Sequence, residues 1–169
     1  LGDVYKRQKL PKEFFNLYLK ELMENNVQIR FIGNVHLAPK ATRDIIFAAV
    51  EKTKKNTGLI LCFAFIYGSQ DEMIQAIQDV AKDVKEGELD IDEINEDLFD
   101  SYLMSADLPN LDFMVRTSGE CRLSNFMLWQ MAYAEMYFTD TYWPDFGVDE
   151  LYDALDYYQK RDRRYGGLK

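Results

Sequence analysis

Residues 27–65, VQIRFIGNVHLAPKATRDIIFAAVEKTKKNTGLILCFAF, decide the class of fold. The opening VQIRFIG alternates and then ends on Gly33, as strands do. The closing LILCFAF is one continuous apolar run, which predicts a strand buried on both faces. Between them, residues 41–55 carry an apolar side at helical spacing, formed by Ile45, Ile46, Ala49 and Val50. A strand, a helix and a second strand in this order indicate a layered α/β arrangement.

Helices and strands continue to alternate on both sides of this stretch. Amphipathic helices are predicted over residues 11–25, 71–86, about 92–104 and 148–161. The apolar stripe of the second of these consists of Met73, Ile74, Ile77, Val80, Ala81 and Val84. Short strands are predicted in DFMVRTSG and AEMYFTD, with a helical stretch from about 124 to 132 between them. We therefore expect an α/β fold with a largely parallel sheet flanked by helices.

Composition and charge limit the classes of partner that the protein can bind. The chain has 169 residues, and with 47% of them hydrophobic it can form a real core. The 29 acidic and 20 basic residues give a net charge of −9, which repels nucleic acid backbones. We expect no nucleic acid partner, and any bound anion must be held by a local cluster of arginines and backbone amides.

Cysteine usage and hydropathy indicate the compartment. Cys62 and Cys121 lie far apart without metal-ligand spacing, so neither a disulfide framework nor a zinc site is expected. This favours a reducing, cytoplasmic setting. No apolar run reaches the ~18 to 20 residues of a membrane-spanning helix, which predicts a soluble or peripheral protein. Residues 1–8, LGDVYKRQ, lack periodicity and are expected to be a non-native leader.

The segment RTSGECRLSN, residues 116–125, has the parts of an anion site. Arg116 ends a strand, Gly119 lets the backbone approach closely, and Arg122 and Ser124 lead into the predicted helix. Helix N-termini expose unpaired N–H groups, and guanidinium groups hold phosphate oxygens with paired hydrogen bonds. Two arginines with a serine suit a diphosphate better than a carboxylate. An ordinary salt-bridged turn is the alternative interpretation of the bare motif.

Glu135 stands apart from that segment, in the apolar and aromatic stretch AYAEMYF. A carboxylate in such surroundings needs a partner. Mg²⁺ is one candidate if a diphosphate is close, because the ion prefers carboxylate and phosphate oxygens together with water. An ion pair with a nearby arginine is the other candidate, and the spacing does not choose between them.

Residues 116–146, RTSGECRLSNFMLWQMAYAEMYFTDTYWPDF, resemble the C-terminal signature of the cis-prenyltransferases, the undecaprenyl diphosphate synthase family. Weaker likeness extends through VQIRFIGN, NTGLILCFAFIYG and RDRRYGG. By this resemblance, the diphosphate of isopentenyl diphosphate binds at Arg116, Arg122, Leu123 and Ser124, and Glu135 helps to bind Mg²⁺. The implied reaction extends an allylic prenyl diphosphate by cis addition of isopentenyl units, which makes a polyprenyl diphosphate.

The resemblance also implies partners. Family members form homodimers, and the tail, here residues 163–167, lies near the partner's active site. Peripheral membrane contact through the product is a further expectation. An alternative that keeps the fold is a noncatalytic partner subunit of a cis-prenyltransferase, and an unrelated α/β phosphate-binding module is a second. The chain lacks the GxxxxGK[ST] and GxGxxG patterns, which argues against the second.

The sequence also departs from the family pattern. Where family members carry Asn-Tyr-Gly-Gly-Arg, this chain has Ile66, Tyr67, Gly68, Ser69 and Gln70. The family's Asp-Gly-Asn-Gly-Arg motif and Asn-Trp element, with the catalytic Asp and Asn, are absent. Residues 9–169 are therefore expected to form a single domain, the C-terminal two-thirds of a cis-prenyltransferase without its first strands. We expect this chain alone to be catalytically inactive.

Overall fold

The computed structural model describes residues 10–161, so the expected leader and the tail at 163–167 lie outside the described residues. The chain divides into two compact units. The first contains the described residues up to Tyr67 together with Leu103–Ser105, and the second contains Gly68–Tyr102 and the chain from Ala106 onward. That residues 9–169 form a single domain stays a prediction.

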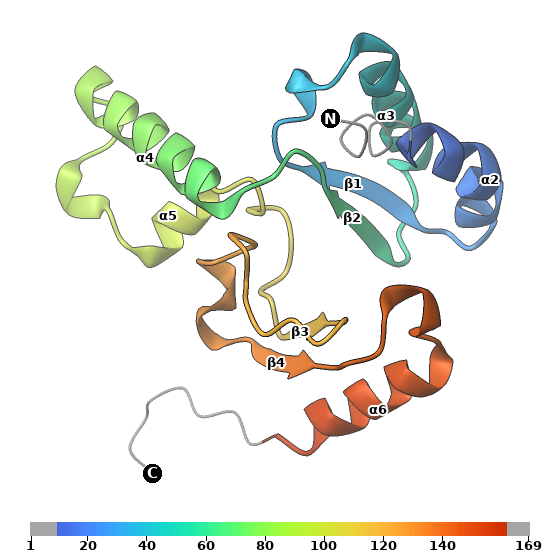
Figure 1. The fold of residues 1–169 in the computed structure, drawn as a ribbon. Helices are drawn as coiled ribbons and strands as arrows, with labels where there is room; N and C mark the ends of the chain where they lie inside the picture. The colour runs from blue at the N-terminus through green and yellow to red at the C-terminus, as the bar shows by residue number, and fades with distance from the viewer. Residues whose placement is uncertain (1–9, 162–169) are drawn as a thin grey trace. The chain divides into compact units, whose positions relative to one another are not determined.

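The first unit is built on two parallel strands. Strands β1 (Gln28–Ile32) and β2 (Ile60–Ala64) pair in register from Gln28 opposite Ile60 to Ile32 opposite Ala64. Helix α3 (Lys40–Thr53) connects them after a short 3₁₀ turn (Val35–Leu37), and helix α2 (Leu10–Glu24) precedes β1 (Figure 1). The predicted strand–helix–strand arrangement and the preceding helix are confirmed.

The core of this unit lies on one face of the strand pair. Phe15 of α2, Ile29 of β1 and Ala49 of α3 form its buried centre. Phe31 and Phe63, which are opposite each other in the register, stack with ring centroids 5.2 Å apart against the same cluster. Apolar side chains from two helices and alternate strand positions therefore meet on one side of the pair.

The expectation that β2 is buried on both faces is wrong. Ile60 and Ala64, at its two ends, are exposed, and the residues between them are half-buried. Phe63 packs against the core of the unit, but the neighbouring positions point to the opposite face. The continuous apolar run reports strand propensity and does not by itself report how many layers cover the strand.

The turns beyond the two strands meet closely. Gly33 follows β1 with φ +105°, and a Cβ at this position would lie 2.3 Å from the carbonyl oxygen of Phe65. Glycine is therefore required here by both conformation and space. The amide of Asn34 donates to the carbonyl of Ile66 at 3.1 Å, which ties the two turns together. Ile66 itself adopts φ +51°, an unusual value for a β-branched residue.

The second unit contains another parallel pair. Strands β3 (Phe113–Arg116) and β4 (Glu135–Phe138) pair from Phe113 opposite Glu135 to Arg116 opposite Phe138. Helix α4 (Ser69–Glu86) opens the unit and helix α6 (Val148–Gln159) closes it, and Tyr158 of α6 packs on Phe113 with ring centroids 5.0 Å apart. The α/β class with parallel strands flanked by helices is confirmed.

Two helices of this unit differ from the prediction. The expected helix at 92–104 is a 3₁₀ turn (Ile91–Glu93) followed by the short α5 (Glu96–Tyr102). The reason is local: a capping box between Asp90 and Glu93 starts the 3₁₀ turn, and the side chain of Asn95 accepts from the amide of Leu98 at the start of α5, so two separate caps divide the segment. The expected apolar stripe of α4 is also displaced, because its buried residues are Ser69, Glu72, Ala76 and Val80, whereas Ile74 and Ile77 are exposed.

Among the helices that the structure describes, none combines the length and the apolar character needed to cross a bilayer.

Candidate functional site

The site lies at the carboxyl end of β3. Arg116 is the last residue of that strand, and the loop that follows is tied to the chain beyond β4 by three backbone hydrogen bonds. The amides of Ser118, Gly119 and Thr139 donate to the carbonyls of Thr141, Thr139 and Arg116, each at 2.9 Å. The loop base is therefore an extension of the strand pair, and it holds Arg116 in a defined position.

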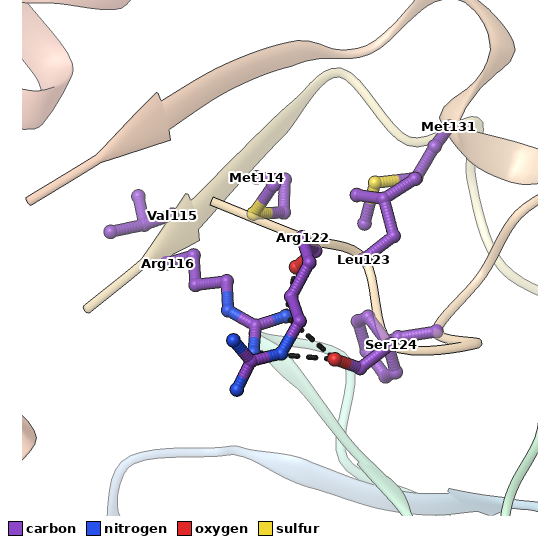
Figure 2. A pocket seen from close by; sticks show the side chains of 8 residues that line it. Met114, Val115, Arg116, Arg122, Leu123, Ser124 and Met131 are labelled. Atoms are coloured by element: carbon purple, nitrogen blue, oxygen red, sulfur yellow. Dashed lines mark hydrogen bonds between the residues drawn. The ribbon is translucent and has the colours of Figure 1, made fainter. Parts of the chain in front are cut away.

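A cavity of about 240 Å³ opens beside this loop. Figure 2 shows its walls, which come from β3, from the loop and from the start of the following 3₁₀ turn. The lining residues are Met114, Val115, Arg116, Arg122, Leu123, Ser124, Phe126 and Met131. All four residues predicted from the sequence to bind a diphosphate thus line one cavity, together with apolar side chains.

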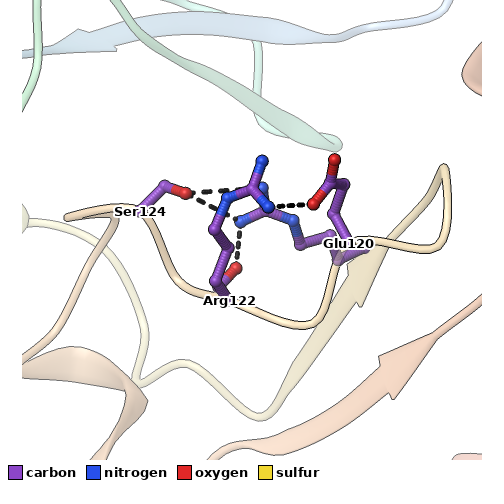
Figure 3. A network of polar contacts seen from close by, with 4 residues as sticks. Glu120, Arg122 and Ser124 are labelled. Carbon is purple, nitrogen blue, oxygen red and sulfur yellow. Dashed lines mark hydrogen bonds and ion pairs between the residues drawn. The ribbon is translucent and has the colours of Figure 1, made fainter.

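The polar groups of the cavity are connected to one another. Both terminal nitrogens of Arg116 lie 3.4 Å from the hydroxyl of Ser124, and one of them donates to the carbonyl of Arg122. The guanidinium of Arg122 forms an ion pair with the carboxylate of Glu120. Figure 3 shows the network. It contains two positive charges and one negative charge, so an incoming anion meets a net positive site within an acidic protein.

Glu120 was missed by the sequence reasoning. The side chains of Arg122 and Glu120 are 61% and 42% exposed, so their ion pair is screened by water. A multiply charged anion with several oxygen acceptors would compete effectively for Arg122. An anion that bound Arg122 would therefore have to displace the carboxylate of Glu120. Its place in the loop next to an arginine gives no signal in the sequence, because the loop conformation decides which side chains meet.

The predicted helical stretch from about 124 to 132 is wrong. Ser124, Asn125 and Met127 have φ values of +51°, +61° and +46°, which no right-handed helix contains. Only Gln130–Tyr133 form a 3₁₀ turn. The expected contribution of a helix N-terminus in this segment therefore does not apply, and the two guanidinium groups with the Ser124 hydroxyl remain as the candidate donors for an anion.

Glu135 is not part of this cluster. It begins β4, and the register places it opposite Phe113, three positions from the pairing partner of Arg116. Three strand residues span about 10 Å. Its carboxylate lies 3.4 Å from Nε of Arg161, and the Arg161 guanidinium also lies over the ring of Tyr157 at 4.4 Å. Of the two partners considered from the sequence, the structure provides the arginine, and Arg161 is the second residue that sequence reasoning missed.

Magnesium can be tested against this arrangement. The ion needs an octahedral shell of oxygens and usually takes one or two carboxylates together with substrate phosphates. Glu135 lies three strand residues from the pairing partner of Arg116 and is paired with Arg161, so it could act as a magnesium ligand only if this ion pair opened. A second carboxylate group, formed by Asp83, Glu86 and Glu88, lies at the end of α4 and in the turn after it and is largely exposed.

Fold and site together define an α/β protein with parallel strands and a cavity lined by two arginines. Comparison with known proteins makes this class specific, because residues 3–166 match the family described as "putative undecaprenyl diphosphate synthase". The chain belongs to the undecaprenyl diphosphate synthase family.

The relatives span bacteria and plants. The chain is 53% identical over 160 residues to an isoprenyl transferase of Halalkalibacterium halodurans and 50% identical to one of Bacillus thuringiensis subsp. konkukian. Both alignments cover 95% of this chain and 62% of the relative, so the chain spans less than two-thirds of these proteins. The crystal structure of lavandulyl diphosphate synthase from Lavandula x intermedia in complex with dimethylallyl diphosphate matches with a TM-score of 0.93 at 33% identity. That match covers 98% of this chain and 72% of the other.

Proposed function

We propose that the cavity at Arg116, Arg122, Leu123 and Ser124 binds the diphosphate of isopentenyl diphosphate. In the whole protein, the isopentenyl unit would be added in cis to an allylic prenyl diphosphate, which makes a polyprenyl diphosphate. The observation that carries the proposal is the convergence of two guanidinium groups and one hydroxyl on a single cavity of an acidic chain. The family membership supports the same chemistry.

The rest of the cavity suits the hydrocarbon part of this substrate. Met114, Leu123, Phe126 and Met131 present apolar side chains beside the arginines. A ligand with a charged head and a short branched alkene would place its diphosphate on the guanidinium groups and its carbons against these side chains. Free phosphate or a sugar phosphate would leave the apolar wall without a matching group.

The reaction assigns a holding role to these residues. A carbon–carbon bond forms between the terminal alkene carbon of isopentenyl diphosphate and C1 of the allylic diphosphate. The C1–oxygen bond breaks, diphosphate leaves with the bonding electrons, and a proton leaves the isopentenyl unit. The diphosphate at Arg116 and Arg122 stays attached throughout, so these side chains orient the nucleophile and do not act on the leaving group.

The allylic substrate and the partner chain complete the proposal. The lavandulyl relative was crystallised with dimethylallyl diphosphate, and an allylic diphosphate of this class is proposed as the second substrate here. A homodimer with peripheral membrane contact through its product, in the cytoplasm, is proposed on the family resemblance. The noncatalytic partner subunit has no specific observation in its favour.

Magnesium dependence stands as a separate proposal, with Glu135 as a carboxylate ligand. When bound, Mg²⁺ would neutralise diphosphate charge. Because Arg161 holds Glu135, binding of the ion requires this ion pair to open. Titration of Mg²⁺ by calorimetry into the chain and its Glu135→Gln variant tests this assignment. Heat of binding that is equal in both proteins would remove Glu135 from the metal site.

Calorimetric titration of isopentenyl diphosphate into the 169-residue chain tests the proposed function. We expect Arg122→Ala to weaken binding by about 10- to 100-fold, since a hydrogen bond to a charged group contributes about 1.5–3 kcal/mol. Arg43→Ala is the matched control, because this arginine donates to the carbonyl of His36 in the other unit. Binding that is equal in all three proteins, or absent from a folded wild-type chain, would contradict the proposal.

A further inference from the structure

The start of α4 is bound to the loop that carries the cavity, within the second unit. Residues 68–72, which include the last three positions of the departure from the family pattern, contact residues 125–130 through hydrogen bonds between backbone and side-chain groups. The contacts explain what this departing segment does in the present chain.

Ser69 is the centre of the contact. It is the first residue of α4 and its side chain is fully buried, at 0% exposure. Its hydroxyl oxygen accepts from the amide of Leu128 at 2.9 Å, and its own amide donates to the carbonyl of Asn125 at 2.9 Å. A glycine at position 69 would keep the second bond but would leave the Leu128 amide without this acceptor.

Asn125 makes the corresponding contact from the loop. Its side-chain oxygen accepts from the amide of Gln70 at 2.8 Å, so it satisfies a donor of the first turn of α4 that has no partner within the helix. The approach is close, since a Cβ on Gly68 would lie 2.8 Å from the side-chain nitrogen of Asn125. Gly68 therefore permits the contact, and the role of Gln70 in it is a backbone one.

A second contact holds the far end of the loop. The side-chain nitrogen Nε2 of Gln130 donates to the carboxylate of Glu72 at 3.2 Å, and Glu72 is only 1% exposed. Trp129 donates to Asp100 of α5, and its ring packs edge-on against Phe99 at 4.8 Å. The loop is thus fixed to α4 and α5 immediately after Ser124.

Ser124 needs this support because of its own conformation. Ser124 and Asn125 are consecutive residues with positive φ. Residues other than glycine seldom adopt this backbone conformation unless the surrounding structure holds it. The Ser124 hydroxyl is placed 3.4 Å from the Arg116 guanidinium by this turn. If the turn relaxed, the hydroxyl would move away from the anion donors.

We propose that Ser69 and Asn125 are positioning residues for the diphosphate cavity. They hold the turn at 124–125 so that Ser124 and Arg122 face Arg116, and Ser69 and Asn125 do not contact the ligand themselves. This inference rests on the proposed function of the cavity. It assigns Gly68, Ser69 and Gln70, the last three positions of the departure, a structural role in this chain: the start of α4 holds the loop, and the loop holds the ligand.

Two measurements on the full chain test the proposal. Hydrogen exchange of the ligand-free protein reports the Leu128 amide, and calorimetry reports the affinity for isopentenyl diphosphate. The variants are Ser69→Ala, which deletes the acceptor of Leu128, and Asn125→Gly, which deletes the side-chain acceptor but tolerates positive φ. Ser101→Ala is the control, because this exposed α5 hydroxyl bonds only the carbonyl of Leu98 in its own helix.

We expect each positioning variant to weaken binding about three- to tenfold, the usual range for one lost hydrogen bond, and Ser69→Ala to speed exchange at Leu128. Ser101→Ala should change neither measurement. In an Arg122→Ala background, Ser69→Ala should weaken binding by less than in the wild type, because both changes act on the same geometry. A role limited to stability would give no such coupling.

Unchanged affinity in both positioning variants, alongside faster exchange at Leu128, would overturn the positioning role and leave the proposed function standing. A wild-type chain with a protected Leu128 amide that does not bind isopentenyl diphosphate would overturn the proposed function, and the positioning role with it. If Ser69→Ala does not fold, Asn125→Gly decides the question alone.

Discussion

The two parallel strand pairs of this protein are built alike and differ in what surrounds them. β1 and β2 share a face with two helices, and Ile29 at the centre of that face is fully buried. In β3 only Met114 is buried, and the strand ends at an arginine beside an open cavity. The first pair is held by apolar burial and the second ends in a polar loop held by hydrogen bonds. We therefore expect changes to the first pair to act on stability, and changes at the carboxyl end of the second pair to act on the proposed ligand binding.

The largest expected effect is a loss of stability caused by a substitution in the first strand pair. Ile29→Ala should lower the free energy of unfolding by about 2–5 kcal/mol, because it removes buried carbons and leaves a cavity beside Phe15 and Ala49. Urea unfolding followed by circular dichroism measures this change. Ile74→Ala on the exposed side of α4 is the control and should cost far less. Equal losses in the two variants would show that the described core does not carry the stability of the unit.

A smaller effect is expected at the turn beyond β2. Ile66 has φ +51° and is 41% exposed, so it bears a conformational cost with limited compensation from burial. Ile66→Asn should raise the free energy of unfolding by about 1 kcal/mol, since asparagine tolerates this conformation. Ile66→Ala keeps a Cβ that disfavours positive φ and should gain less. Destabilisation by Ile66→Asn would show that the isoleucine side chain contributes more than its backbone costs.

A substitution at Glu120 tests the expectation that changes beside the second strand pair act on ligand binding. Glu120→Gln removes the carboxylate that pairs with Arg122, so isopentenyl diphosphate should bind up to about fivefold more tightly with no change in unfolding. Glu88→Gln, an exposed carboxylate after α4, controls for the change in net charge. Weaker binding after Glu120→Gln would indicate that this carboxylate orients Arg122 for the ligand.

The smallest expected effect concerns Cys62 in β2. Burial raises its thiol pKa above the usual 9.0, and the positive charge of Arg30 opposes this shift. Because the folded state holds the proton more tightly, this contribution to stability is complete below pH 9.0 and is lost as the pH rises through the raised pKa. Alkylation of Cys62 should therefore need a higher pH than in the unfolded chain, and Arg30→Ala should raise that pH further. An unshifted or lowered profile in the variant would contradict the Arg30 contribution.

These two regions also show what the sequence could predict. Strand and helix periodicities are strong in the first unit, and its elements were placed within a residue or two. Arg116, Arg122 and Ser124 were predicted as a diphosphate site because they lie within nine positions after a strand, and the structure places them around one cavity. Apolar residues between 126 and 132 imitate helical spacing, but the contacts of Asn125 and Gln130 with α4 hold a different turn. Long-range partners such as Arg161 for Glu135 are decided by packing and leave no local pattern.

A crystal structure of this chain with isopentenyl diphosphate tests the central claim most directly. The account predicts diphosphate density contacting the guanidinium groups of Arg116 and Arg122 and the hydroxyl of Ser124, with Glu120 turned away from Arg122. Density for the diphosphate at any other place on the chain, with the Arg122–Glu120 ion pair intact, would contradict the claim that this loop is the diphosphate site.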